Sequence, residues 1–255
     1  MKQLLVIGIA AFTTSVLFAA VPAKDASKGR LPPAEAREKL RRAMGDKIVK
    51  PGSQKGKIAF IDTQSDVAST NFEALARTQA RETGYNVVYE KAKPGDPVAL
   101  KAASKADIAV IITADDTAPV LLSAIEDGWA VVNVRKLTES LMSDEAKAKF
   151  HASRCQKEVL RALASVAGGF SSQYQNNCIS MTKIPDLDLC GVFIPNDALQ
   201  NMRKYLAVRN VSPKVVAFYR QACMQGWAPA PTNDIEKVIW DKVHQLPTKP
   251  ITIKP

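Results

Sequence analysis

The 255-residue sequence has few of the residues on which common catalytic sites depend. It contains two histidines, which excludes a site with three imidazole ligands, and its four cysteines form no CxxC pair. The signatures GxGxxG, GxxxxGK[ST] and GxSxG are absent, so dinucleotide, P-loop and α/β-hydrolase sites have no support. The three tryptophans are scattered and the most basic segment lacks aromatic residues. We therefore expect no cofactor and no nucleic-acid partner.

The N-terminus has the layout of a secretory signal peptide. Met1 to Gln3 is a short basic start, residues 4–20 carry no charge, and Val21-Pro22-Ala23 offers a cleavage site. We expect residues 1–23 to be removed near Ala23 and the mature protein to be periplasmic or extracellular. The alternative is an uncleaved anchor, because the apolar run is close to the lower limit for spanning a bilayer. No later stretch approaches that length, so no transmembrane segment is expected in the mature chain.

Positive charge is concentrated in residues 24–56, which we interpret as a basic arm and linker. From Lys24 to Lys57 there are eleven Lys and Arg residues against four acidic ones, whereas the whole chain has 35 against 25. Within this arm, residues 33–44 are predicted to form a short helix. The arm either acts as a solvated tether, which we favour, or binds an anionic envelope surface such as lipid head groups.

The remaining sequence predicts one α/β domain at residues 57–246, with an extended tail at 247–255. Three apolar runs alternate with two helical patterns, at residues 57–63, 69–83, 86–89, 97–104 and 107–113. This order is typical of parallel strands joined by crossover helices. Two further runs, 120–124 and 129–134, flank Asp127-Gly128, which is a hairpin signal, and a helix is the alternative for the run that ends at Ile125. Further helices are predicted at residues 144–151, 153–167, 196–206, 213–224 and 233–246.

We therefore expect a three-layer α/β (α+β) fold. Its mixed five-stranded sheet should have one antiparallel strand at the edge, and a helical C-terminal part should follow it.

Export would place all four cysteines in an oxidising compartment, where thiols pair. The residues are Cys155, Cys178, Cys190 and Cys223. We therefore expect two disulfides, for which three connectivities are possible. Cys178 and Cys190 are close enough in sequence to form a short loop, which would leave Cys155 with Cys223. A four-cysteine zinc site is the alternative, but it is disfavoured because the chain has no CxxC pair.

Acidic residues and histidines elsewhere offer weak candidates for catalysis. Asp115 and Asp116 follow a predicted strand, but adjacent side chains point in different directions, so we favour turn and cap roles for them. His151 lies in a helix rich in Lys and Ala and is interpreted as a surface residue. His244 is close to a helix C-terminus, where an imidazole suits the helix dipole. A metal-independent hydrolase using Asp115, Asp116 or His151 is one alternative function, and a structural envelope protein held by the basic arm is another.

The order of elements resembles the metzincin clan of zinc proteases, and most of all the archaemetzincins. The resemblance covers roughly residues 57–185. It rests on the strands and edge hairpin up to Leu137, the long helix ending in glycine, and the Met181-bearing loop that follows. The extra zinc-binding cysteines of archaemetzincins are not reproduced. Cys178 lies one residue further from Met181 than their pattern has it, and no CxxC follows.

When the family signature HExxHxxGxxH is aligned with this helix, none of the three histidines and the glutamate of the signature is present in this sequence. In order, the aligned positions carry Arg161, Ala162, Ser165, Gly168 and Ser171, and Met181 would supply the Met-turn. Catalytic zinc needs three imidazole or carboxylate ligands, whereas a guanidinium stays protonated and repels the ion. The resemblance therefore implies a pseudo-protease without zinc that binds a peptide, a protein or an envelope component in the old cleft. A buried Arg161 would need an acidic partner, for which Glu158, Asp186 and Asp188 are the candidates. The ligand and the oligomeric state stay open.

Overall fold

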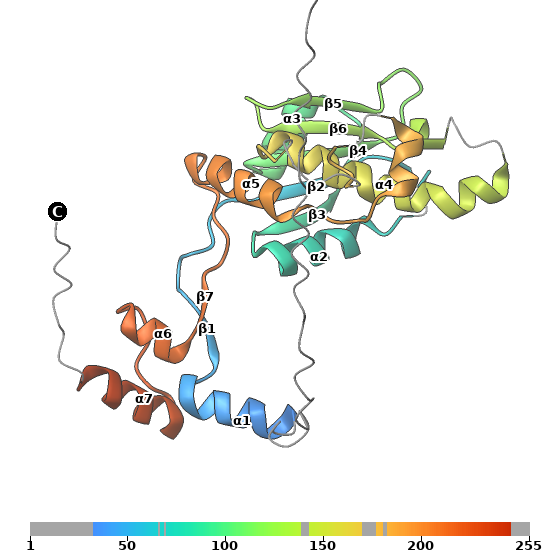
Figure 1. Cartoon of the computed structure of the whole chain (residues 1–255). Helices are drawn as coiled ribbons and strands as arrows, with labels where there is room; N and C mark the ends of the chain where they lie inside the picture. The colour runs from blue at the N-terminus through green and yellow to red at the C-terminus, as the bar shows by residue number, and fades with distance from the viewer. Residues whose placement is uncertain are drawn as a thin grey trace, which may run out of the picture. The chain divides into compact units, whose positions relative to one another are not determined.

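The computed structural model describes residues 33–245, except for residues 66, 69, 139–142, 170–176 and 181–182. The chain divides into two compact units, Met1–Ala43 and Met44–Pro255. The described part of the first unit is residues 33–43, which belong to helix α1 (Pro33–Met44), and this helix has the bounds predicted from the sequence (Figure 1). Its first turn carries Glu35 and its last turn carries two arginines, which is the charge order that a helix dipole favours.

The second unit contains seven strands, six α-helices and two short 3-10 helices among its described residues. In chain order they are β1 (Lys47–Val49), β2 (Ile58–Asp62), α2 (Phe72–Thr83), β3 (Val87–Lys91), α3 (Pro97–Ser104), β4 (Ile108–Thr113), β5 (Leu121–Ala124), β6 (Trp129–Asn133), η1 (Arg135–Thr138), α4 (Asp144–Val166), η2 (Ile184–Leu189), α5 (Asn196–Val208), β7 (Val216–Phe218), α6 (Tyr219–Met224) and α7 (Asp234–His244). None of the described helices has both the length and the apolar character that crossing a bilayer requires.

Five of the strands form one mixed sheet in the order β3-β2-β4-β6-β5 (Figure 1). β2 runs parallel to β3 and β4, and β4 runs parallel to β6, whereas β5 pairs with β6 in the antiparallel direction. The turn between β5 and β6 includes Gly128, whose φ of +69° suits glycine. The predicted mixed five-stranded sheet with one antiparallel edge strand is therefore confirmed.

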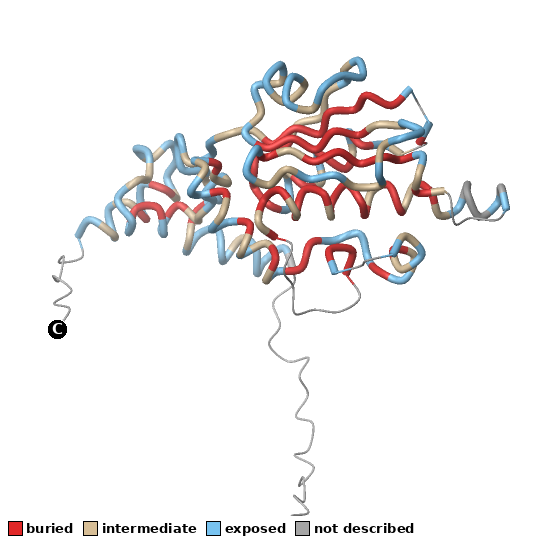
Figure 2. Tube along the Cα trace, turned by 90° about the horizontal axis from the view of Figure 1, so that it is seen from above, coloured by how far each residue is buried: buried red, intermediate tan, exposed pale blue. Residues whose placement is uncertain are grey.

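The two faces of the sheet are covered by different helices, which produces the predicted three layers. Side chains alternate between the faces along each strand. Phe60, Val110 and Val132 belong to the large core that the sheet shares with α2 and α4. The opposite face, which includes Ile111, packs against Leu100 of α3. The central strands β2, β4 and β6 are almost entirely buried (Figure 2), whereas no residue of the edge strand β5 is buried.

Two predictions about helices are wrong. Residues 144–151 and 153–167 form the single 23-residue helix α4, because Ala152 continues the helix. The predicted helix at residues 213–224 is replaced by the short strand β7 and the six-residue helix α6. β7 pairs antiparallel with β1, and the neighbouring apolar residues of α6 and α7 form a separate small core that includes Tyr219 and Ile239.

Candidate functional site

Helix α4 is the central element of the candidate site. It packs against β4, β5 and β6 of the sheet and against η2. Its apolar residues, such as Val159, Leu160 and Leu163, are buried in the large core. Arg154, Glu158, Arg161 and Ser165 recur at helical spacing, so they share one face of the helix.

Arg154 connects this face of α4 to η2 and η1 through hydrogen bonds. Its side chain is only 2% exposed. Its Nε and Nη2 donate to the two carboxylate oxygens of Asp188, at 2.8 and 2.6 Å, and its Nη1 donates to the backbone oxygen of Leu137 at 2.9 Å. One turn along, Lys157 donates to the backbone oxygen of Leu187. These bonds hold η2 against α4. They also show that Asp188 forms its ion pair with Arg154 and not with Arg161.

Arg161 lies two turns later and interacts with Glu158. Its Nη1 is 3.4 Å from Oε2 of Glu158, and the guanidinium-bearing side chain is 26% exposed while that of Glu158 is fully buried. Burial raises the pKa of Glu158, and the neighbouring Arg161 cation acts in the opposite direction. Asp186, another of the partners considered for Arg161, lies in η2, where its backbone N–H donates to Lys183.

The other positions aligned with the zinc-protease signature have no metal-binding chemistry. Ala162 is fully buried in the large core, and Ser165 is half-buried. Gly168 has a φ of +77° in the turn after the helix, and a Cβ added there would lie 2.6 Å from Cβ of Tyr205. Ser171 and Met181 lie outside the described residues. Within the part of the chain that the structure describes, no three His, Cys, Asp or Glu side chains are placed to hold a metal ion.

The segment before Met181 packs close to α4. Cys178 and Ile179 are buried in the same core as the apolar residues of the helix. The side chain of Asn177 accepts from the backbone N–H groups of Ile179 and Ser180, at 3.0 and 3.2 Å, which closes a tight turn. Residues 177–180 therefore lie close to α4.

The expected disulfides are not present, because all four cysteines are free. Each thiol is packed as a small apolar side chain. Burial raises the pKa of both Cys155 and Cys178 to about 12 and also raises the pKa values of Cys190 and Cys223. Sequence reasoning from the compartment alone could not show which interior positions these residues occupy.

Each of the alternative catalytic residues interacts with a partner other than the other two. His151 was predicted to be on the surface, but it is 8% exposed and its Nε2 is 2.8 Å from the backbone oxygen of Val134. Asp115 accepts hydrogen bonds from Thr117, which lower its pKa, and Asp116 forms an ion pair with Arg135. Asp115 therefore has the turn role favoured for it, whereas Asp116 forms an exposed ion pair rather than a cap.

His244 is at the end of α7, as expected. Its Nδ1 lies 2.8 Å from the backbone oxygen of Trp240, and the two rings stack with their centroids 4.1 Å apart. The geometry is that of a helix end and gives no sign of catalysis.

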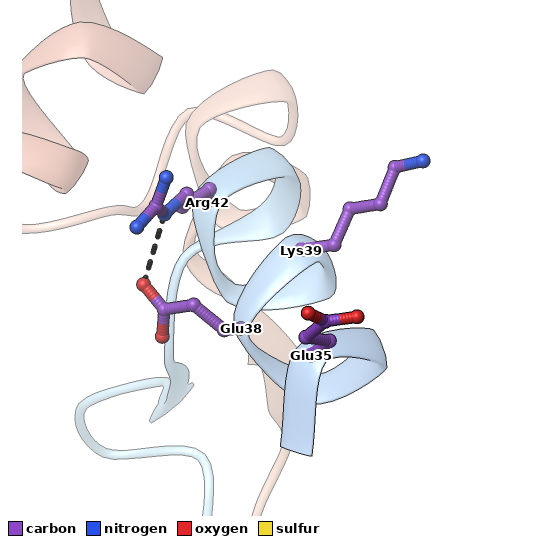
Figure 3. A pocket seen from close by; sticks show the side chains of 4 residues that line it. All are labelled: Glu35, Glu38, Lys39 and Arg42. Atoms are coloured by element: carbon purple, nitrogen blue, oxygen red, sulfur yellow. Dashed lines mark hydrogen bonds and ion pairs between the residues drawn. The ribbon is translucent and has the colours of Figure 1, made fainter. Parts of the chain in front are cut away.

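Helix α1 presents a separate hollow of about 430 Å³ (Figure 3). Four side chains of the helix line it, namely Glu35, Glu38, Lys39 and Arg42. Arg42 points toward Glu38 and donates to it at 2.9 Å, whereas Lys39 points away from both. Because the lining mixes two acids with two bases on one exposed helix, it provides no defined charge for a cofactor or a catalytic group.

The edge strand β5 has backbone groups directed away from the sheet. The backbone N–H of Asn133 donates to Val120, and Leu121 lies opposite Val132. In an antiparallel pair, bonding alternates from residue to residue, so the N–H and C=O groups of Leu121 and Ser123 face outward. β5 ends the described sheet, and Ser123 is exposed. Sequence reasoning located this edge through the hairpin signal but did not identify these two residues.

No protein-family model matches the sequence, and no curated protein matches it. Among solved structures, the archaemetzincin from Methanopyrus kandleri has 16% identity, a TM-score of 0.46, and an alignment covering 63% of this chain and 99% of that one. A zinc-dependent peptidase from Methanocorpusculum labreanum has 14% identity, coverage of 58% and 100%, and a TM-score of 0.38. The archaemetzincin from Archaeoglobus fulgidus has 14% identity, coverage of 57% and 99%, and a TM-score of 0.36. Two of these three structures are of archaemetzincins, the proteins that the sequence was found to resemble, and nothing about the chemistry of this chain follows from the likeness.

Proposed function

We propose that this protein is an exported, catalytically inactive archaemetzincin-like protein that binds an extended peptide along the free edge of β5. The observation that carries the proposal is the outward direction of the backbone groups of Leu121 and Ser123. Export, to the periplasm or the extracellular space, rests on the signal-like layout of residues 1–23.

An exposed strand edge is a template for a further strand. A bound peptide can pair with the outer edge of β5 through the two N–H and two C=O groups of Leu121 and Ser123. Soluble proteins usually blunt such edges with charged residues or proline, because open edges otherwise cause aggregation. β5 has the sequence Leu-Leu-Ser-Ala, which contains neither. An edge that is left open is suited to a partner.

Charge on α4 indicates which peptides are preferred. α4 packs against β5, and Arg161 exposes about a quarter of its side chain, 26%, to solvent. Its contact with Glu158 is long, at 3.4 Å, and burial favours the neutral form of that carboxyl. The guanidinium can therefore donate a stronger charge-assisted hydrogen bond to another acceptor. We expect an acidic side chain or a C-terminal carboxylate in the peptide.

The same residues support the loss of peptidase activity. Hydrolysis by the metzincin route needs a general base next to a zinc-bound water. Ala162 has no group that exchanges protons, and the permanently protonated Arg161 repels a metal ion. Substrate cleavage by this route is therefore not expected, whereas binding along β5 needs only backbone groups.

A variant of Ser123 tests the binding mode. Peptides are selected from a random library against the mature protein, and their affinities are then measured with Ser123→Pro and Ser123→Ala. Proline removes one outward N–H, and edge strands tolerate it because the bonds to β6 are kept. We expect Ser123→Pro to weaken binding about tenfold, the effect of about one hydrogen bond, and Ser123→Ala to leave it unchanged. Equal affinity in both folded variants contradicts the binding mode.

Catalysis and export are tested separately. The mature protein, incubated with zinc and a fluorogenic peptide library, should release no fluorescence above that of an Arg161→Ala control. Zinc-dependent cleavage would overturn the assignment as an inactive protein.

Mass spectrometry of protein secreted from its natural host should give an N-terminus at Lys24. Retention of residues 1–23 would overturn export.

A further inference from the structure

A second hollow lies on the opposite face of the sheet from α4. Its volume is about 460 Å³, which is within the usual range for small-molecule pockets. Its floor includes Thr63, Ile111 and Val131, which follow or belong to β2, β4 and β6. None of these residues takes part in the peptide edge or in the Arg161 region, so the hollow is a separate feature of the fold.

The topology of the sheet explains why a hollow forms here. The connection from β2 to β3 runs through α2 on one face, and the connection from β3 to β4 runs through α3 on the other face. Loops that diverge in this way leave a crevice outside the carboxyl ends of parallel strands, where ligands bind in many α/β proteins. α3 has only eight residues, and the hollow lies beyond its N-terminal Pro97, at this end of the sheet.

The floor of the hollow is apolar and is continuous across three strands. Ile111 lies opposite Val131, and Val131 lies opposite Leu122 of β5, so the three side chains form one row. Ile111 and Val131 are buried, and Leu122 is 48% exposed at the rim. An apolar body of a ligand would cover this row and bury the exposed part of Leu122.

The walls come from two loops that the fold holds in place. Pro94 and Gly95 form one side, and the loop from Asp115 to Ala118 forms the other. The side-chain amide of the fully buried Asn133 donates to the backbone oxygens of Asp115 and Ala118, at 2.6 and 2.8 Å. A loop fixed at two points by a buried amide is already organised before a ligand arrives, which lowers the entropic cost of binding.

The polar side chains that line the hollow are those of Thr63, Thr113 and Asp115, and the hydroxyl of Thr63 already donates to the backbone oxygen of Ile112. Asp115 is the one charged residue among its described lining, and its carboxylate is held by Thr117 and by the backbone N–H of Ala118. A complementary ligand therefore carries N–H donors and positive charge.

We propose that this hollow binds a small molecule with an apolar body and a primary ammonium group. The apolar body would lie on the row of Ile111, Val131 and Leu122, and the ammonium group would pair with the carboxylate of Asp115.

Three probes that share one apolar body test the proposal. Phenethylamine, phenethyl alcohol and 3-phenylpropanoate are titrated into the isotope-labelled mature protein at millimolar concentrations, and backbone amide shifts locate and measure binding by NMR. We expect the amine to shift the amides of Ile111, Thr113 and Val131 and to bind more tightly than the alcohol, with the carboxylate weakest. No shift at these residues, or equal binding of amine and carboxylate, overturns the proposal.

Two neighbouring aspartates provide matched variants. Asp115→Asn keeps an oxygen that can accept the hydrogen bonds of the turn, and Asp116→Asn removes an equal charge from a residue that does not line the hollow. We expect Asp115→Asn to weaken phenethylamine binding about fivefold, as for an exposed ion pair, without changing the alcohol. Asp116→Asn should leave the amine unaffected. Equal weakening by both variants would mean that general charge attraction, not this site, holds the amine.

Discussion

Arg154 and Arg161 lie two helical turns apart on α4 and have different surroundings. The side chain of Arg154 is 2% exposed and makes a two-bond ion pair with Asp188, whereas that of Arg161 is 26% exposed and is 3.4 Å from Glu158. Removal of one member of a buried pair leaves the other charge uncompensated. After removal of Arg161, Glu158 can instead take up a proton, because burial already raises its pKa.

We therefore predict that Arg154→Ala lowers the free energy of unfolding by about 3 kcal/mol or more. Arg161→Ala should cost about 1 kcal/mol or less, because its side chain is partly exposed and its ion pair is long. Urea unfolding of both variants at neutral pH measures these values. Equal losses would show that Arg161 is part of the structural framework rather than available to a ligand.

Glu158 makes stability depend on pH. A carboxyl group whose pKa is raised on folding binds more protons in the folded state than in the unfolded state, so stability falls as the pH rises from the ordinary value of 4.5 through the folded pKa. Glu158→Gln removes this loss. We predict that the stability of the variant relative to the natural protein increases from pH 4 to pH 8, as measured by urea unfolding at several pH values. A constant difference would contradict the raised pKa.

At the scale of elements, the end of α4 depends on a glycine that packs against α5. A Cβ at Gly168 would meet the side chain of Tyr205 at 2.6 Å in a backbone with φ of +77°, whereas Gly52, with φ of +65°, has nothing within 4 Å. Both positions carry the backbone cost of an L-residue, about 1–2 kcal/mol. Gly168 adds the cost of overpacking, typically about 1–3 kcal/mol.

Alanine at each position separates the two costs. We predict that Gly168→Ala lowers the free energy of unfolding by about 3 kcal/mol, against about 1 kcal/mol for the control Gly52→Ala. Thermal unfolding of both variants measures the difference. Similar losses would show that α5 does not press on the end of α4.

Local sequence patterns predicted elements whose partners are close in the chain. Asp127-Gly128 indicated the β5–β6 hairpin, because the turn residues themselves determine the pairing. β7 was missed, because Val216 to Phe218 form a strand only through pairing with Lys47 to Val49, far away in the sequence. Periodicity within a short window carries no information about such a partner.

The same limit applies to the candidate site: its local features were predictable from the sequence, but its long-range contacts were not. The resemblance located the Arg161 helix, and the spacing placed Glu158 one turn away. The pairing of Asp188 with Arg154 and the burial of His151 depend on how α4 packs against the rest of the chain, and the free cysteines depend on where the fold places each of them. Sequence neighbours do not determine these contacts.

At the scale of the whole molecule, the sheet separates two proposed binding functions. The outer edge of β5 is proposed to receive a peptide next to α4, and the α3 face is proposed to receive a small cation beside Asp115. Side chains alternate between the two faces along β5, and the side chain of Leu122 is on the α3 face, as is that of its partner Val131. The backbone N–H and C=O groups of Leu121 and Ser123 instead point outward from the edge of the sheet. Each site can therefore be altered without loss of the other.

Amide hydrogen exchange of β5 tests the central proposal most directly. A selected peptide is added to the mature protein, and exchange is followed for each residue by NMR. The outward N–H groups of Leu121 and Ser123 should exchange at least about tenfold more slowly when the peptide pairs with them, the effect of about one hydrogen bond each. Those of Leu122 and Ala124, which already bond to β6, should change little. Unchanged exchange at Leu121 and Ser123 with peptide bound would contradict the account.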